Sequence, residues 1–251
     1  MDLVDSVGAA AARASVVTAR QARASHYTRV TEPRSPLRVS FFCLSSLNDP
    51  MDILILAALV AVAAFAFKSR EQSRRIALLG SHLGQYQVEK LMENLTQGYL
   101  RCLGEDDPAR REQIWHLLDS SEEALAQQFK SFAAEFSRVD EPAARVSKLP
   151  LALPLACTLF PAATFDVRKA FAIHARGIAD TAANARGLTP KRKAFTMSAE
   201  LFLMQHTCHW FCKSKAVASA RMLARHQTRY DQLLDAVSPD TRKAYEQLVG
   251  R

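Results

Sequence analysis

The feature that most constrains this chain is an apolar run at 53–67, ILILAALVAVAAFAF, which contains no polar side chain. Four bases follow it directly: Lys68, Arg70, Arg74 and Arg75. Fifteen helical residues rise about 22 Å, short of the roughly 30 Å hydrocarbon core of a bilayer unless Met51 and the long Lys68 side chain extend the span. A helix that is apolar on every side favours lipid over a soluble core. We therefore predict a transmembrane anchor at residues 51–67.

The charges flanking this run predict its orientation. Basic residues stay on the cytoplasmic side of a membrane, and the four bases lie just after the run, whereas the nearest ones before it are Arg34 and Arg38. We therefore expect the N-terminus outside and the C-terminal domain in the cytoplasm. Arg outnumbers Lys 23 to 10, as in GC-rich coding sequences, which favours a bacterial source and hence the inner (plasma) membrane.

Two alternatives to an anchor remain for the apolar run. Ala64-Phe65-Ala66 resembles the cleavage site of a signal peptide, although the acidic residues before the run and the bases after it argue against cleavage and export. The other alternative is a helix buried in a soluble core, where so long a run without a polar face is rare.

Residues 1–50 differ in composition from the rest of the chain. They hold six Arg and no Lys, are rich in Ser and Ala, and show no apolar periodicity, so we expect them to be disordered. Because Met51-Asp52 is followed directly by the apolar run, we hypothesise that translation begins at Met51 and that 1–50 is a non-native upstream extension. An Arg-rich organellar transit peptide is the alternative.

Helix signals continue through the body of the chain. Apolar residues at helical spacing over 71–103 predict a stalk helix, assigned to 68–103, that continues the anchor. Asp107-Pro108 and the capping box Ser120-x-x-Glu123 predict separate helices over 108–119 and 121–138. Further helices are expected over 164–186, 190–236 and from Pro239 to just before Gly250.

Three prolines, Pro150, Pro154 and Pro161, interrupt residues 142–163 and predict a connector with at most a short helix. The connector is rich in leucine, so we expect it to pack onto the body. No segment alternates apolar and polar residues as a strand would. The predicted fold class is all-α, with one N-terminal transmembrane helix followed by a cytosolic bundle of about six helices, whose domain covers 104–251.

The segment His206-Thr207-Cys208-His209-Trp210-Phe211-Cys212 places four potential metal or haem ligands close together. The candidates are His206, Cys208, His209 and Cys212. A Cys/His pair at a spacing of three or four residues supplies two ligands, half of a structural zinc site. The sequence has no second pair at the usual spacing. Cys208 and Cys212 also belong to an apolar stripe with Leu201, which favours core packing. Zinc or haem ligation and a redox thiol pair remain the alternatives, and the odd number of scattered cysteines favours reduced thiols.

Charge is distributed unevenly along the body. Residues 104–141 hold ten acidic and four basic residues, whereas 142–251 hold seven acidic and seventeen basic ones. Within the basic half, four bases form a row at helical spacing: Lys213, Arg221, Arg225 and Arg229. A solvated or ion-paired face is the favoured interpretation, and contact with an anionic membrane surface is the alternative. We do not expect nucleic-acid binding, because aromatic residues interleaved with these bases are missing apart from Tyr230.

Enzyme signatures are missing from the sequence. It contains no Gly-rich phosphate loop, no Rossmann fingerprint, no Gly-x-Ser-x-Gly and no His-Glu-x-x-His, so nothing supports a catalytic assignment. The sequence favours a single-pass membrane protein without a cofactor, whose cytosolic helical domain binds another protein or a second copy of itself as an interaction or scaffold module. The alternative is a membrane-tethered metal, haem or redox-thiol protein that uses His206–Cys212.

Overall fold

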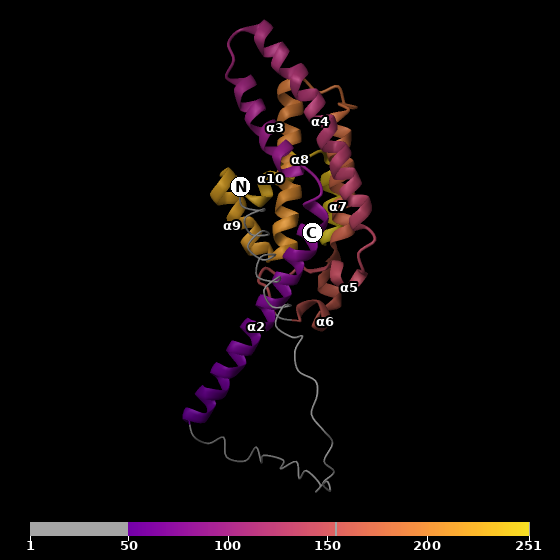
Figure 1. The fold of residues 1–251 in the computed structure, drawn as a ribbon. Helices are drawn as coiled ribbons and strands as arrows, with labels where there is room; N and C mark the ends of the chain where they lie inside the picture. Colours follow the sequence, from indigo (N-terminus) through magenta and orange to yellow (C-terminus); the bar gives the residue numbers. More distant parts are fainter. Residues whose placement is uncertain (1–49, 154, 251) are drawn as a thin grey trace, which may run out of the picture.

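The computed structural model describes residues 50–153 and 155–250 (Figure 1). The predictions made for residues 1–50, together with Cys43, therefore fall outside the described residues except at Pro50. Most of the described chain is helical, which confirms the all-α class.

The helices, in chain order, are α2 (Pro50–Leu83), α3 (Val88–Leu103), α4 (Pro108–Phe136), α5 (Glu141–Ala144), α6 (Ala156–Leu159), α7 (Val167–Ala182), α8 (Pro190–Cys212), α9 (Lys215–His226), α10 (Tyr230–Ala236) and α11 (Pro239–Val249). A 3-10 turn covers Pro161–Ala163. Two short strands, β1 (Arg145–Ser147) and β2 (Thr164–Asp166), pair antiparallel on either side of the connector. The sequence analysis missed this pair, because three-residue strands are too short to show a periodicity.

Helix α8 runs lengthwise through the body, with α9 and α10 on one side and α4 and α7 on the other (Figure 1). It is buried on nearly all sides from Ala199 to Phe211, rather than along the single apolar stripe that we predicted. Beside it, five aromatic rings pack with neighbouring centroids 5.1 to 6.3 Å apart: Phe129, Phe132, Phe136, Phe171 and Phe211. This cluster joins α4, α7 and α8 into one core.

Several predicted helix starts are confirmed. The Asp107 carboxylate caps α4 by accepting a hydrogen bond from the Ala109 N–H at 3.0 Å, and Pro108 is the first helical residue. Ser238 caps α11 in the same way, 3.2 Å from the Thr241 nitrogen. Gly250 ends α11 with a φ of 73°, a left-handed conformation that favours glycine.

Other predicted boundaries are wrong. The two helices predicted over 108–119 and 121–138 are one helix, α4, which ends at Phe136. The Ser120 hydroxyl donates to the Leu117 carbonyl at 3.0 Å instead of starting a new helix. The predicted stalk helix is interrupted at 84–87, and the separate helix α3 packs along α4. The helix predicted over 164–186 begins only at Val167, after β2, and ends at Ala182.

The helix predicted over 190–236 is also interrupted. It breaks at Lys213, whose φ and ψ of −128° and −85° leave the helical region, and again at Gln227, which adopts a left-handed conformation. The Ser214 side chain then caps α9 by accepting a hydrogen bond from the Val217 N–H.

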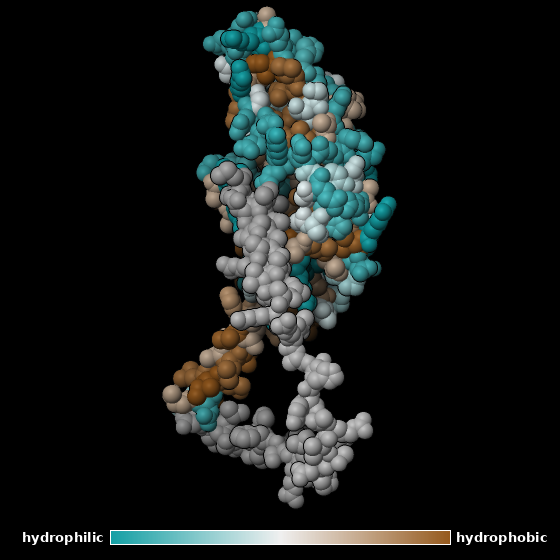
Figure 2. Space-filling model, viewed as in Figure 1, coloured by the Kyte–Doolittle hydropathy of each residue, from teal (hydrophilic) through white to brown (hydrophobic). Residues whose placement is uncertain are grey.

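Helix α2 has two halves in different environments. Its apolar first half projects from the body, and none of its most apolar 18-residue window is buried. Its second half packs into the core, where Leu79 is 1% exposed. Figure 2 shows the first half as a brown rod below the body. Among the described residues, α2 is the one helix long and apolar enough to cross a membrane.

Candidate functional site

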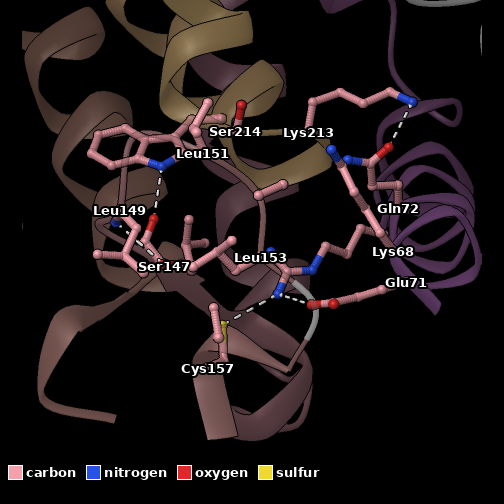
Figure 3. A pocket seen from close by; sticks show the side chains of 15 residues that line it. Lys68, Glu71, Gln72, Ser147, Leu149, Leu151, Leu153, Cys157, Lys213 and Ser214 are labelled. Atoms are coloured by element: carbon pink, nitrogen blue, oxygen red, sulfur yellow. Dashed lines mark hydrogen bonds and ion pairs between the residues drawn. The ribbon is translucent and has the colours of Figure 1, made fainter. Parts of the chain in front are cut away.

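An open pocket lies where α2 enters the body (Figure 3). Its walls come from α2, from the connector after β1, and from the end of α8. Lys68 and Lys213 bring positive charge to this pocket, and Leu151 and Leu153 bring apolar surface. The pocket therefore combines bases and leucines at the point where the apolar half of α2 leaves the body.

Arg75 fixes α2 to the body beside this pocket. Its guanidinium donates to the Phe211 carbonyl at 3.3 Å, to the Arg145 carbonyl at 3.2 Å and to the Glu71 carboxylate at 2.7 Å. Lys213 adds a bond of 3.2 Å to the Gln72 side-chain oxygen. Arg75 was predicted to belong to the basic collar of the membrane span, but it serves as a tether between α2, β1 and α8. The sequence carries no local signal for this role, because the two carbonyl groups that Arg75 binds lie 136 and 70 residues away.

The connector does not pack onto the body as we predicted. Five of its six largest apolar side chains are 49–64% exposed: Leu151, Leu153, Leu155, Leu159 and Phe160. Only a few residues of the segment face inward, such as Ala156, which is 4% exposed. We therefore correct that prediction: the segment is attached to the body but presents its leucines outward.

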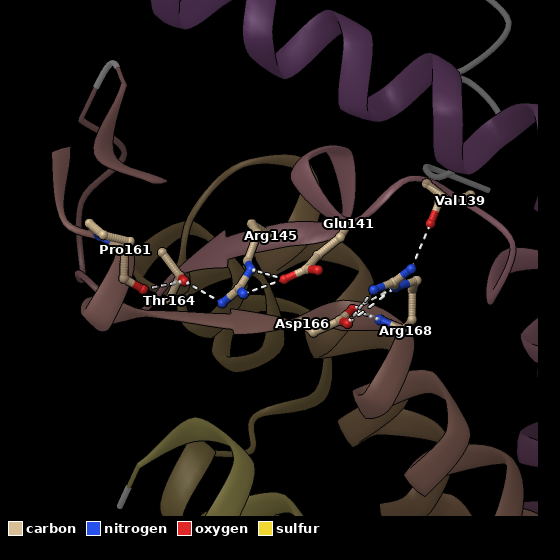
Figure 4. A network of polar contacts seen from close by, with 7 residues as sticks. All are labelled: Val139, Glu141, Arg145, Pro161, Thr164, Asp166 and Arg168. Atoms are coloured by element: carbon tan, nitrogen blue, oxygen red, sulfur yellow. Dashed lines mark hydrogen bonds and ion pairs between the residues drawn. The ribbon is translucent and has the colours of Figure 1, made fainter. Parts of the chain in front are cut away.

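A polar network holds the two ends of the connector together (Figure 4). Arg145 on β1 pairs with Glu141 and donates to the Thr164 hydroxyl at 3.2 Å. Arg168 pairs with Asp166 at 2.8 Å and donates to the Val139 carbonyl at 2.8 Å. The Arg168 guanidinium, with its hydrogen bonds, holds the pKa of Asp166 below its ordinary value. The network fixes β1 against β2, so the exposed loop between them starts and ends on a rigid base.

Three of the four candidate ligands of the His206–Cys212 segment contact different neighbours. The His206 Nε2 lies 3.1 Å from the Ser219 hydroxyl, and its ring stacks on Tyr230 with centroids 4.6 Å apart. The Cys208 thiol lies 3.9 Å from the Met204 sulfur, and His209 Nδ1 lies 3.2 Å from an Arg221 nitrogen. Within the described ranges, no group of three or more His, Cys, Asp or Glu side chains is placed to hold a metal ion. Zinc or haem binding here stays a prediction.

The thiols of this segment lie in an apolar environment. Burial raises the pKa of Cys212 to about 12 and raises that of Cys208 well above its ordinary value. Both side chains are free cysteines. Because the thiolate is the reactive form of cysteine, the raised pKa values disfavour reaction at both sulfurs at neutral pH. Burial also lowers the pKa of His206 to about 3, so its imidazole is neutral at physiological pH.

The predicted row of bases is not one row. The break at Lys213 separates this residue from α9, which carries Arg221 and Arg225, and Arg229 precedes α10. The three arginines are exposed, whereas Lys213 is half-buried in the pocket beside α2. The four bases therefore do not form one helix face, and the spacing in the sequence no longer supports their contact with an anionic surface as one unit. Of the four bases, Lys213 lies beside the second part of α2, where it bonds to Gln72.

Two buried polar groups that the sequence analysis did not single out support the core around α8. His174 Nε2 donates to the Thr207 hydroxyl at 2.9 Å, Thr207 donates to the Leu203 carbonyl, and the Tyr245 hydroxyl lies 2.9 Å from Thr207. Burial lowers the pKa of His174 to about 3. The Thr207 hydroxyl has one proton, which it donates to the Leu203 carbonyl. It can therefore only accept hydrogen bonds from His174 and Tyr245. This chain ties α7 and α11 to α8.

Glu200 is the second group. It is fully buried, and its Oε1 accepts a hydrogen bond from the Ser238 N–H at the start of α11. Burial raises the pKa of this carboxyl to about 6. A single acidic residue within an apolar helix, between Ala199 and Leu201, was the sequence signal for such a group.

The far end of the body carries a second apolar surface. Four large side chains of α3, α4 and α8 are 49–71% exposed: Leu100, Leu103, Leu117 and Phe195. Figure 2 shows apolar surface at this end, near the loop between α3 and α4. The buried Glu122 on α4 accepts a hydrogen bond from Tyr99 on α3 and pairs with Lys193 on α8, which joins these three helices. We call these four side chains the distal patch.

The chain matches no family model, no curated protein and no solved structure.

Proposed function

We propose that the chain is a single-pass membrane protein whose helical domain lies on the cytosolic side and binds another protein. One observation carries the membrane assignment. The apolar first half of α2 is fully outside the core, although the same helix enters the core at Leu79. A core helix of a soluble protein would be mostly buried, so this exposure argues against that alternative. Lipid is the solvent in which an unburied apolar rod is stable.

The orientation follows from the bases that end the rod. Lys68, Arg70 and Arg74 lie on the surface of α2 or at its junction with the body, and Arg75 is engaged by the body. Three available bases still favour the cytosolic side for everything after Phe67. Free Cys208 and Cys212, one helical turn apart, fit a reducing compartment. A bacterial inner membrane, with the N-terminus outside, is the location that these features favour.

The binding role is supported by the distal patch. Monomeric proteins seldom expose several large apolar side chains together, and such patches typically bind other proteins. The patch lies on helices tied together by the buried Glu122 pair, so it is rigid in shape. We propose that it binds a protein partner, a second copy of the chain included.

Membrane fractionation of the full-length chain tests the anchor. We expect the chain to stay in the membrane pellet after alkaline carbonate and to dissolve only in detergent. A double variant, Leu59→Arg with Val62→Arg, should move to the soluble fraction, because each arginine at the centre of a span costs about 2.5–3.5 kcal/mol. Both positions are exposed outside the core, so the body should remain folded. Leu100→Arg, on the body, is the matched control and should stay in the pellet.

Three outcomes would contradict the proposal. The first is an unmodified chain that is soluble in detergent-free extract. The second is a mature chain cleaved near Ala66, which would identify a signal peptide. The third is a body protected from protease in inverted membrane vesicles, which would place it outside the cytosol.

Photo-crosslinking in membranes tests the binding role. A crosslinking amino acid at Leu117, in the distal patch, should give an adduct with another protein chain, and mass spectrometry would identify that chain. The control position is the exposed Gln127, further along α4. An absence of adducts at both Leu117 and Leu100 would refute the binding surface.

A further inference from the structure

The exposed leucines of the connector require a partner that the body does not supply. We call residues 149–153 and 155–160 the apolar connector. Among the described residues, 21 large apolar side chains are exposed, and 15 of them lie either in the first half of α2 or in the apolar connector. The two segments are about 100 residues apart in the sequence. Their common apolar exposure at one end of the molecule calls for a common explanation.

The outward direction of these side chains is fixed by the backbone. The Ala216 N–H donates to the Pro150 carbonyl at 3.0 Å, and the Lys148 N–H donates to the Ala163 carbonyl at 2.8 Å. Inside the connector, Cys157 lies 3.4 Å from the Arg75 guanidinium. The connector is therefore attached to α2 through Cys157 and to α9 through Pro150, and the bond between Lys148 and Ala163 joins the chain just outside its two ends. Its leucines form the outer side of a structured segment.

The apolar connector lies at the level where α2 leaves the body. Lys68, the first residue after the apolar run, lines the same pocket as Leu151 and Leu153 (Figure 3). In Figure 1, α6 lies at the end of the body from which α2 projects, opposite the loop between α3 and α4. If α2 crosses a bilayer up to Lys68, the connector meets the surface of that same bilayer.

The charges beside the connector match an anionic lipid surface. Lys68 and Lys213 flank its leucines in the pocket, and Arg70 and Arg74 are exposed on the next turns of α2. The nearby acidic groups Glu71 and Glu141 are paired with arginines, Glu71 with Arg75. Apolar side chains bordered by bases are the pattern of segments that lie within the headgroup region of a membrane.

We infer that the apolar connector is a second membrane contact, which inserts its leucines among the headgroups of the leaflet that α2 leaves. The partner is an anionic phospholipid surface. With two contacts, the body is held in one orientation over the membrane, with the distal patch directed away from it. This inference depends on the proposed anchor, since α2 brings the connector to the bilayer.

Depth-dependent fluorescence quenching tests the inference on the full-length chain. The chain is reconstituted in vesicles of phosphatidylglycerol and phosphatidylcholine whose acyl chains carry bromine, a contact quencher. A fluorescent amino acid, introduced by codon suppression, replaces one residue at a time: Leu159 in the connector, Val60 in α2, or Leu100 in the distal patch. All three positions are exposed, so the probe does not disturb the core.

We expect strong quenching at Val60, intermediate quenching at Leu159 and none above background at Leu100. In vesicles of phosphatidylcholine alone, quenching at Leu159 should decrease, because the bases lose their anionic partners. Equal quenching at Leu159 in both kinds of vesicle would refute the claim that the bases bind anionic headgroups.

The positions separate the two proposals. Quenching at Val60 with an unquenched probe at Leu159 would overturn the second membrane contact and leave the anchor standing, and the connector would then bind protein instead. Quenching at Leu159 without quenching at Val60 would overturn the anchor instead. An unquenched probe at both positions would overturn both.

Discussion

Replacement of Glu200 by glutamine should remove a pH dependence from the stability of the fold. Glu200 is fully buried on α8, and its carboxylate accepts a hydrogen bond of 3.0 Å from the Ser238 N–H. Burial opposes the charged form more strongly than the hydrogen bonds and the distant Arg186 favour it, so the pKa is raised from 4.5 to about 6. The folded chain therefore carries a carboxyl group that takes up a proton more readily than the unfolded chain does.

Proton linkage sets the direction and size of the effect. Because the folded-state pKa lies above the unfolded value, the folded state binds more protons between about pH 4.5 and 6. The contribution of Glu200 to stability is complete below pH 4.5 and is lost as the pH rises through 6. The difference between the two pKa values, at about 1.36 kcal/mol per unit, corresponds to about 2 kcal/mol.

The assay is denaturant unfolding of the full-length chain in mild detergent, followed by circular dichroism from acidic to neutral pH. The free energy of unfolding of Glu200→Gln, relative to the unmodified chain, should rise by about 2 kcal/mol between acidic and neutral pH. Glu93→Gln, at an exposed position on α3, controls for the loss of one charge. A difference between Glu200→Gln and the unmodified chain that is the same at every pH would refute the reasoning.

The same unfolding assay checks three further variants, and labelling checks a fourth prediction. Gly177→Ala should destabilise the fold by about 1–3 kcal/mol, because the added Cβ would lie 2.3 Å from Thr241 Oγ1 and 2.5 Å from Glu200 Oε2. Gly104→Ala is the control and should not destabilise the fold, because the atom nearest to its added Cβ would be 3.5 Å away. Thr207→Val should cost about 1–3 kcal/mol for each buried donor left without an acceptor, namely His174 and Tyr245, and Thr207→Ser should restore most of it. Lys193→Met should cost about 3–5 kcal/mol by leaving the Glu122 carboxylate buried without its ion-pair partner, and an unchanged stability would contradict that pairing. Cys208 should resist maleimide in the folded chain and react after unfolding; rapid labelling of the folded chain would contradict its burial.

Local signals predicted the ends of helices better than their continuity. Asp107, Ser238 and Gly250 act at the positions that the sequence indicated, because a cap depends on a few neighbouring backbone groups. Ser120 carries the same local pattern but lies inside α4, where its hydroxyl bonds back to Leu117. A serine can serve either arrangement, and the packing of α4 along α3 and α7 decides between them.

Long-range contacts account for most of what the sequence could not predict about the candidate sites. Arg75 binds carbonyl groups of Phe211 and Arg145, and no spacing in the chain indicates such partners. The His206–Cys212 segment combined ligand-like residues with an apolar pattern. The structure places its His and Cys side chains among separate neighbours, because α8 is surrounded by other helices and each side of it meets a different one.

For the apolar connector, the pattern of apolar residues did not predict whether the side chains are buried. We expected its leucines to be buried because water is the assumed solvent on every side of a globular domain. Near Lys68 that assumption fails if α2 crosses a bilayer, since the end of the body next to the span then faces lipid headgroups instead of bulk water. Next to a membrane span, exposed leucines would hold the body against the lipid surface. Exposed leucines far from the span, as in the distal patch, would instead promote binding to protein. The composition of an apolar segment therefore predicts that it will be removed from water. Its position relative to α2 decides whether it is covered by protein or by lipid.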